Sequence, residues 1–236
     1  MALQPLTVCT SQVGSPRHVP KALNAGVDII CAQGYEAGGH TGEVATMVLI
    51  PQVVKLCKGK TSPLSGGPVH VVAAGGMYSG ATLAAALALG AEAVWVGTRF
   101  LASDEATATK MHKETIVAAK CEDTVRSVIF TGRPARFYKN PYVRDWEENR
   151  QADIAALTSK GKIPYAVDLD EATREGWTKL QNKFSMTKDA QGISFSQSCG
   201  DIDSIKPAGV LVREMISEAV QCLQGGANRV RFTSRL

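Results

Sequence analysis

The chain has 236 residues, of which 44% are hydrophobic and 20% are charged, the composition of an ordinary globular protein. The formal net charge is only +4 and no dense block of Lys and Arg occurs, which argues against nucleic acid as a partner. The longest apolar helical stretch, residues 81–89, is too short to cross a bilayer, so we expect no membrane partner.

Cysteine and histidine usage narrows the class further. The six cysteines show no metal-finger spacing and the four histidines are dispersed, so no metal site is expected. No signal peptide is recognisable, and the cysteines fit a reducing intracellular compartment. We therefore expect a cytoplasmic protein.

The first 120 residues predict a strand-and-helix unit that is repeated four times. The expected strands and helices alternate along the chain, as strands 6–13, 27–32, 69–74 and 93–96 and helices 18–24, 47–56, 80–89 and 105–120. Ser79 is expected to cap the third helix. Strands that are apolar on both faces and alternate with amphipathic helices indicate a parallel sheet, so the fold class is α/β.

The pattern changes after residue 120. We expect a short strand over residues 125–130 and a basic loop over 131–139. A helical segment broken at Pro164 is expected over 141–182, and an irregular stretch over 186–203. Residues 207–223 predict a last amphipathic helix, and Gly225 is expected to start a frayed tail. We divide the chain into a body (1–120), a helical and irregular insertion (121–206), and a returning helix with its tail (207–236).

A glycine-rich loop follows the second expected strand. It runs from Gln33 to Gly42 and contains four glycines, which free the backbone for left-handed or closely approaching conformations. The loop carries one imidazole, His40, and one carboxylate, Glu36. Parallel α/β proteins place their chemistry in loops at the carboxyl ends of strands, so this loop is the first candidate site.

Two later turns have the form of anion sites. Gly75-Gly76 follows the third expected strand, and Gly97-Thr98 follows the fourth, each opening a helix. Helix N-termini present unpaired N–H groups, and glycine lets a phosphate approach those amides. Tight strand-to-helix packing is the alternative interpretation of each pair. Two such turns in successive units, after a loop with a histidine, favour phosphate binding.

Taken together, these motifs resemble the nitronate monooxygenase family, formerly called 2-nitropropane dioxygenase. The resemblance rests on four stretches, Gln33-Gly34-x-Glu36-Ala37-Gly38-Gly39-His40-x-Gly42, Ala73-Ala74-Gly75-Gly76, Ala84–Ala91 and Gly97-Thr98-Arg99-Phe100. It implies an FMN-dependent (β/α)₈ barrel, a TIM barrel, that oxidises alkyl nitronates with O₂. The family usually has Gly-Gln before its final helix, whereas this chain has Gly200-Asp201.

The resemblance also implies roles for single residues. The histidine of the motif, here His40, is the catalytic base or the nitronate-binding group beside the flavin ring. The implied cofactor site has three parts. Gln33 starts the loop, Ala37 and Gly38 lie near the flavin ring, and the two phosphate turns are Gly75-Gly76 and Gly97-Thr98. Glu36 is expected to orient the loop. Trp95 is expected to lie in the core or barrel wall, and His112 on the surface.

Only four of the eight strand-and-helix units of a barrel are expected, although a full barrel takes ~250 residues. The chain resembles the C-terminal half of the barrel, with its helical insertion. We favour a recorded sequence that lacks its N-terminal part. Two alternatives stay open, a homodimer that closes the barrel edge to edge, and a non-catalytic relic.

Two enzyme functions and one non-enzymatic function follow from these patterns. The leading hypothesis is a nitronate monooxygenase-like flavin oxidoreductase whose partners are a small nitronate and O₂. A flavin-dependent enoyl reductase is the second, since such enzymes have a similar Gly-Gly-His loop. A non-catalytic binding or scaffold protein is the third, because four strands are lacking.

Overall fold

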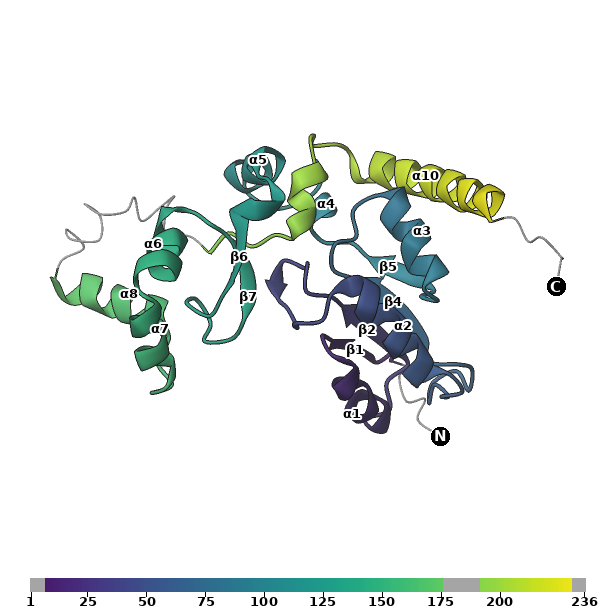
Figure 1. Cartoon of the computed structure of the whole chain (residues 1–236), viewed down its shortest axis with the longest axis horizontal. Coiled ribbons are helices and arrows are strands. Elements are labelled where there is room, and N and C mark those ends of the chain that lie inside the picture. The colour runs from purple at the N-terminus through teal and green to yellow at the C-terminus, as the bar shows by residue number, and fades with distance from the viewer. Residues whose placement is uncertain (1–6, 176–191, 231–236) are drawn as a thin grey trace.

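The computed structural model describes residues 7–175 and 192–230 (Figure 1). The N-terminal part of the chain forms a sheet of four parallel strands. Its strand order is β1-β2-β4-β5, so each strand lies beside the next parallel strand along the chain. The strands are β1 (Thr10–Val13), β2 (Ile29–Gln33), β4 (His70–Ala74) and β5 (Ala93–Trp95). The predicted α/β class and all four predicted strands are confirmed.

Helices cover one face of this sheet. They are α1 (Val19–Asn24), preceded by the 3₁₀ turn η1 (Pro16–His18), α2 (Thr46–Cys57) and α3 (Gly80–Ala88). Alternate strand residues such as Ile30, Ala32 and Val71 pack with them in one apolar core. The opposite face is bare over much of its area, because Gln12 and Ala93 are exposed and the Trp95 side chain is 64% exposed. Trp95 therefore lies outside the core, and of the two predicted positions only the barrel wall remains.

The predicted cap of α3 is confirmed, and the last helix of the chain packs against α3. The Ser79 hydroxyl accepts from Thr82 N, and the Thr82 hydroxyl accepts from Ser79 N. Helix α10 (Ala208–Arg229) packs on α3 so closely that a Cβ on Gly80 would lie 2.4 Å from Met215 O. The predicted start of a frayed tail at Gly225 is wrong, because α10 continues to Arg229. Each glycine costs a formed helix only ~1 kcal/mol.

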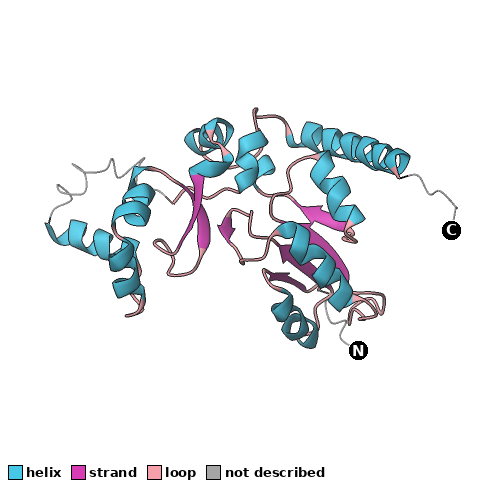
Figure 2. Cartoon of the chain, in the orientation of Figure 1, coloured by secondary structure: helices cyan, strands magenta, loops and turns pink. Residues whose placement is uncertain are grey.

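A second group of strands lies apart from the first, as Figure 2 shows. It is antiparallel, in the order β3-β7-β6, with β3 (Gly39–His40), β6 (Thr124–Ser127) and β7 (Ala135–Tyr138). The expected loop over 131–139 thus contains a strand, and that prediction is wrong. Arg136 is only 2% exposed. Because a charged residue usually indicates an exposed position, the sequence pattern did not indicate a buried strand here.

The remaining helices surround this hairpin or join it to the sheet. They are α4 (Thr98–Leu101), α5 (Lys110–Ala118), α6 (Pro141–Asn149), α7 (Gln151–Thr158) and α8 (Pro164–Glu175), with the 3₁₀ turns η2 (Cys121–Asp123) and η3 (Gln197–Asp201). The expected helix over 105–120 is shorter, because Thr109 caps it by accepting from His112 N. Pro164 begins a helix. The predictions for 176–182 and 186–191 lie outside the described residues.

The helical body around α6 is fixed by one buried carboxylate, which yields a first prediction. Asp168 accepts from Tyr142 Oη at 2.9 Å, from Trp146 Nε1 at 3.1 Å and from the Arg150 guanidinium at 3.2 Å. Burial above all, and then the charge of Asp168, raise the pKa of the Tyr142 hydroxyl, so it stays a donor. Tyr142→Phe should lower the free energy of unfolding by about 1.5–3 kcal/mol, the value of a hydrogen bond to a charged group.

Urea titration measures this loss, and Tyr165→Phe is the matched control. The Tyr165 ring packs in the same apolar cluster, but its hydroxyl is not one of the donors to Asp168. The control should change stability by less than about 0.5 kcal/mol. Equal losses in the two variants would show that the bond to Asp168 gives the Tyr142 hydroxyl no special part in stability.

A second buried carboxylate makes the stability of the sheet depend on pH. Asp28 accepts from Cys9 N at 2.8 Å, from the Ser62 hydroxyl and from Leu64 N at 3.1 Å. These bonds, the one from Cys9 first, lower the pKa of Asp28 in spite of its burial. Its stabilisation is therefore present above the unfolded-state pKa of about 3.9 and is lost as pH falls through the lower folded-state pKa.

Asp28→Asn should accordingly destabilise the chain at pH 7 and much less at pH 3. The measurement is the urea midpoint of both proteins at several pH values. A difference between wild type and variant that stays constant across this range would contradict an ionised Asp28 as the stabilising species.

Candidate functional site

The carboxyl ends of β2, β4 and β5 meet at one cavity of about 190 Å³, which also reaches the bare face of the sheet. All seven residues predicted to bind the cofactor line it, namely Gln33, Ala37, Gly38, Gly75, Gly76, Gly97 and Thr98. They come from three separate loops. Because parallel strands end on the same edge of a sheet, those loops converge there.

The turn after β4 needs glycine for two reasons. Gly75 and Gly76 have φ angles of +88° and +71°, which L side chains rarely adopt. A Cβ on Gly75 would also lie 2.8 Å from both N and O of Gly34. The turn therefore brings bare backbone to the cavity wall, as the close approach of a phosphate group requires.

The turn after β5 is tied to a distant segment. Thr98 is 5% exposed, and its hydroxyl accepts from Ser196 N at 2.8 Å. The same segment crosses Gly38, where a Cβ would lie 2.5 Å from the Phe195 carbonyl carbon. Gly97, by contrast, has open space around its Cβ position. The residues present fit a phosphate-bearing cofactor, because bare backbone forms the wall where such a group would lie.

His40 lies just outside this cavity. It is exposed, is not among the lining residues, and belongs to β3, which pairs with β7. Its Nε2 atom lies 3.1 Å from Thr131 Oγ1 in the loop between β6 and β7. His40 thus lies two residues along the chain from the lining residue Gly38, and its imidazole contacts the loop of the hairpin. Its catalytic role stays a prediction.

Glu36 acts as the sequence predicts, by fixing the loop. Its carboxylate accepts from Thr46 N at 3.1 Å, and its Oε2 lies 2.6 Å from the Thr46 hydroxyl. The same hydroxyl lies 3.0 Å from Gly75 O, so Thr46 joins the histidine loop to the phosphate turn. A Cβ on Gly34 would collide with Thr46, which explains the glycine at that position.

Neither a metal-binding cluster nor a membrane-spanning helix occurs among the described residues. No group of three His, Cys, Asp or Glu side chains lies close enough to hold a metal ion. None of the helices in this part of the chain is both long and apolar enough to span a membrane.

Comparison with known proteins identifies the family. A model of the nitronate monooxygenase family matches residues 4–218. The chain belongs to the nitronate monooxygenase family. The resemblance that the motifs indicate is therefore confirmed.

Three similar proteins illustrate the range of this family's relatives. A Mycobacterium tuberculosis protein named as a monooxygenase is 35% identical over 221 residues, which cover 92% of this chain and 55% of that protein. The structure of FabK from Thermotoga maritima matches with a TM-score of 0.72 and 30% identity, over 95% of this chain and 64% of that one. The structure of a nitroalkane oxidase from Streptomyces ansochromogenes matches with a TM-score of 0.67 and 27% identity, over 93% of this chain and 59% of that one. The chain thus spans about 55–64% of these proteins.

The sequence patterns missed three residues or segments at or beside this candidate site in the nitronate monooxygenase family member. Ser194, Phe195 and Ser196 line the cavity but lie in a stretch that was expected to be irregular. Trp95 lines it as well. His112, expected on the surface, is half-buried, and its Nε2 atom lies 3.3 Å from Ser194 O. Burial lowers the pKa of His112, so the neutral ring is favoured beside this carbonyl.

Proposed function

We propose that this member of the nitronate monooxygenase family is a flavin oxidoreductase that binds FMN and oxidises alkyl nitronates with O₂. The observation that carries the proposal is the cavity at the carboxyl ends of the strands. Seven residues chosen from sequence motifs line it, and two of them, Gly75 and Gly76, present left-handed bare backbone.

Bound FMN would supply the redox chemistry with O₂. The turns at Gly75-Gly76 and Gly97-Thr98 would hold its phosphate, and Gln33, Ala37 and Gly38 would contact its ring. His40 would bind the nitronate or act as the base, with Thr131 orienting its ring through the 3.1 Å contact. Phe195 and Trp95 would limit access of water to the ring.

The phosphate assignment is tested with two flavins that differ only in that group. We expect the purified chain to bind FMN at least about tenfold more tightly than riboflavin, since hydrogen bonds to a charged group contribute about 1.5–3 kcal/mol. Quenching of flavin fluorescence measures both affinities. Equal affinities, or no binding of either flavin, would contradict a phosphate site at these turns.

A flavin-dependent enoyl reductase is the second candidate, because such enzymes resemble this chain in the Gly-Gly-His loop that ends at His40. The two reactions consume different reactants. Oxygen uptake with propyl-2-nitronate supports the monooxygenase. NAD(P)H oxidation that depends on an enoyl thioester supports the reductase. A chain that binds no flavin and catalyses neither reaction would be the non-catalytic alternative.

We also infer that the sheet is half of a (β/α)₈ barrel that needs four more strands. Its strands are parallel and sequential, β1 and β5 are its edge strands among the described residues, and the face that would line a barrel is bare at Gln12 and Trp95. A second copy of the chain could supply those strands by pairing β5 of each copy with β1 of the other. Light scattering tests this, because a dimer has twice the mass of the 25.1 kDa chain.

A further inference from the structure

A second cavity lies on the helix-covered side of the sheet, behind the phosphate turn. It has a volume of about 300 Å³ and lies between α2 and α3, with η2 and η3 at one end. Gly75, Gly76 and Met77 line both this cavity and the candidate flavin cavity, so one turn of chain separates them.

Most of its wall is apolar. Met47 and Ile50 of α2 line it, as do Ala85 of α3 and Leu89, the residue that follows α3. Met47 is 61% exposed, so the cavity is open to solvent at this residue. The volume is at the lower end of the roughly 300–1,000 Å³ of ligand pockets and about twice that of an engineered 150 Å³ cavity that binds benzene. The size therefore fits a small molecule with a short apolar chain.

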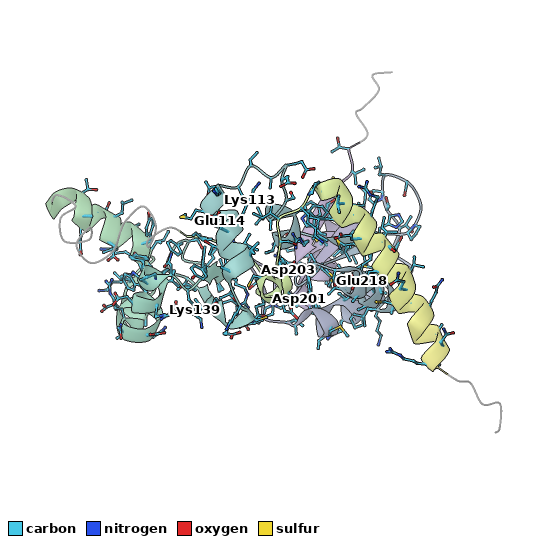
Figure 3. All side chains as sticks on the ribbon, turned by 90° about the horizontal axis from the view of Figure 1, so that it is seen from above. Lys113, Glu114, Lys139, Asp201, Asp203 and Glu218 are labelled. Carbon is cyan, nitrogen blue, oxygen red and sulfur yellow. The ribbon has the colours of Figure 1, made fainter. Side chains whose placement is uncertain are left out.

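The charged groups of the cavity are acidic. Glu36 and Asp201 line it, and none of the described residues in its lining is a Lys, Arg or His. Figure 3 shows Asp201 in the η3 segment, with Glu218 of α10 near by. Burial first, then the hydrogen bond to Asp201 and the charges of Asp201 and Glu218, raise the pKa of Tyr78, another lining residue.

Hydrogen bonds hold Glu36 in place through both its backbone and its carboxylate. Gln197 N donates to Glu36 O at 3.0 Å, which joins η3 to the histidine loop across the end of the cavity. Glu36 Oε2 takes the short contact to the Thr46 hydroxyl, which leaves acceptor capacity on Oε1. A cationic head group in the cavity would have two acidic residues among its lining, the partly buried Glu36 and the exposed Asp201, and the apolar residues of α2 and α3 as its wall.

We propose that this second cavity is a binding site for a small primary alkylammonium ion, whose head lies at Glu36 and Asp201 and whose apolar chain lies between α2 and α3. The site is separate from the flavin cavity and does not depend on the proposed enzyme activity.

The test uses three six-carbon probes at pH 7 that differ in charge, hexylamine, 1-hexanol and hexanoate. Hexylamine is protonated at this pH, like a lysine side chain. Isothermal titration of the purified chain should show hexylamine binding about tenfold more tightly than 1-hexanol, with no detectable binding of hexanoate. Equal binding of hexylamine and 1-hexanol, or binding of none of the three, would overturn the proposal without bearing on the flavin site.

Two pairs of variants locate the binding. Ala85→Phe should fill the cavity and abolish hexylamine binding, whereas Ala88→Phe, exposed on the same helix and outside the cavity, should leave it unchanged. Asp201→Asn should lower hexylamine affinity about fivefold or more and leave 1-hexanol unchanged, whereas Asp203→Asn, which lies outside the cavity, should not. Equal effects within either pair would overturn the site. The comparison of probes on the wild-type chain remains decisive if a variant does not fold.

Discussion

Gly75→Ala should lower the affinity for FMN by about 10- to 100-fold, while the affinity for riboflavin changes little, because the turn that holds the phosphate can no longer keep its shape. It should also lower the free energy of unfolding by about 2–4 kcal/mol, which combines the cost of φ = +88° for alanine with the collision against Gly34. Fluorescence quenching and urea titration measure the two effects.

Gly59→Ala is the matched control for this variant. Gly59 has a similar φ of +74°, but no atom lies within 4 Å of its Cβ position, and it lies far along the chain from the turns. It should lose only about 1 kcal/mol and keep its FMN affinity. If both variants lose FMN affinity to the same extent, general destabilisation explains the loss and the phosphate turn at Gly75 is the wrong assignment.

The part of the fold that follows local chemistry could be predicted from the sequence. Buried parallel strands are continuous apolar runs, and Ser79 with Thr82 forms a helix cap within four residues, so these elements are visible in short windows. The glycines of the site are visible for the same reason, since a left-handed turn after a strand is a local requirement.

The parts that failed depend on long-range contacts. Gly38 and Phe195 meet although 157 positions separate them, and no periodicity marks Ser194–Ser196 as part of a cavity wall. Strand β7 contains Arg136, whose buried guanidinium donates to Thr124 Oγ1 and Tyr35 O, partners that a sequence window cannot show. Trp95 lies between two valines, so its run is apolar on both faces and does not reveal which face is bare.

His40→Ala should reduce oxygen consumption with an alkyl nitronate by about 10²- to 10⁴-fold, the usual contribution of a positioned acid or base. FMN affinity should stay within threefold of the wild type, because His40 does not line the cavity that would hold the cofactor. The measurement is kcat/KM for propyl-2-nitronate in an oxygen electrode, with flavin content determined on the same samples. His18→Ala, an exposed histidine on η1, is the control and should retain full activity.

The position of His40 makes this experiment decisive for the proposed function. Its imidazole is exposed and contacts Thr131, so a purely structural role would show as lost stability with little change in the rate. A role in the reaction predicts the reverse, because removing an exposed side chain costs little stability. A His40→Ala chain that binds FMN and retains activity within threefold would assign the chemistry to another group in the cavity, and the resemblance of the loop would then extend to its shape alone.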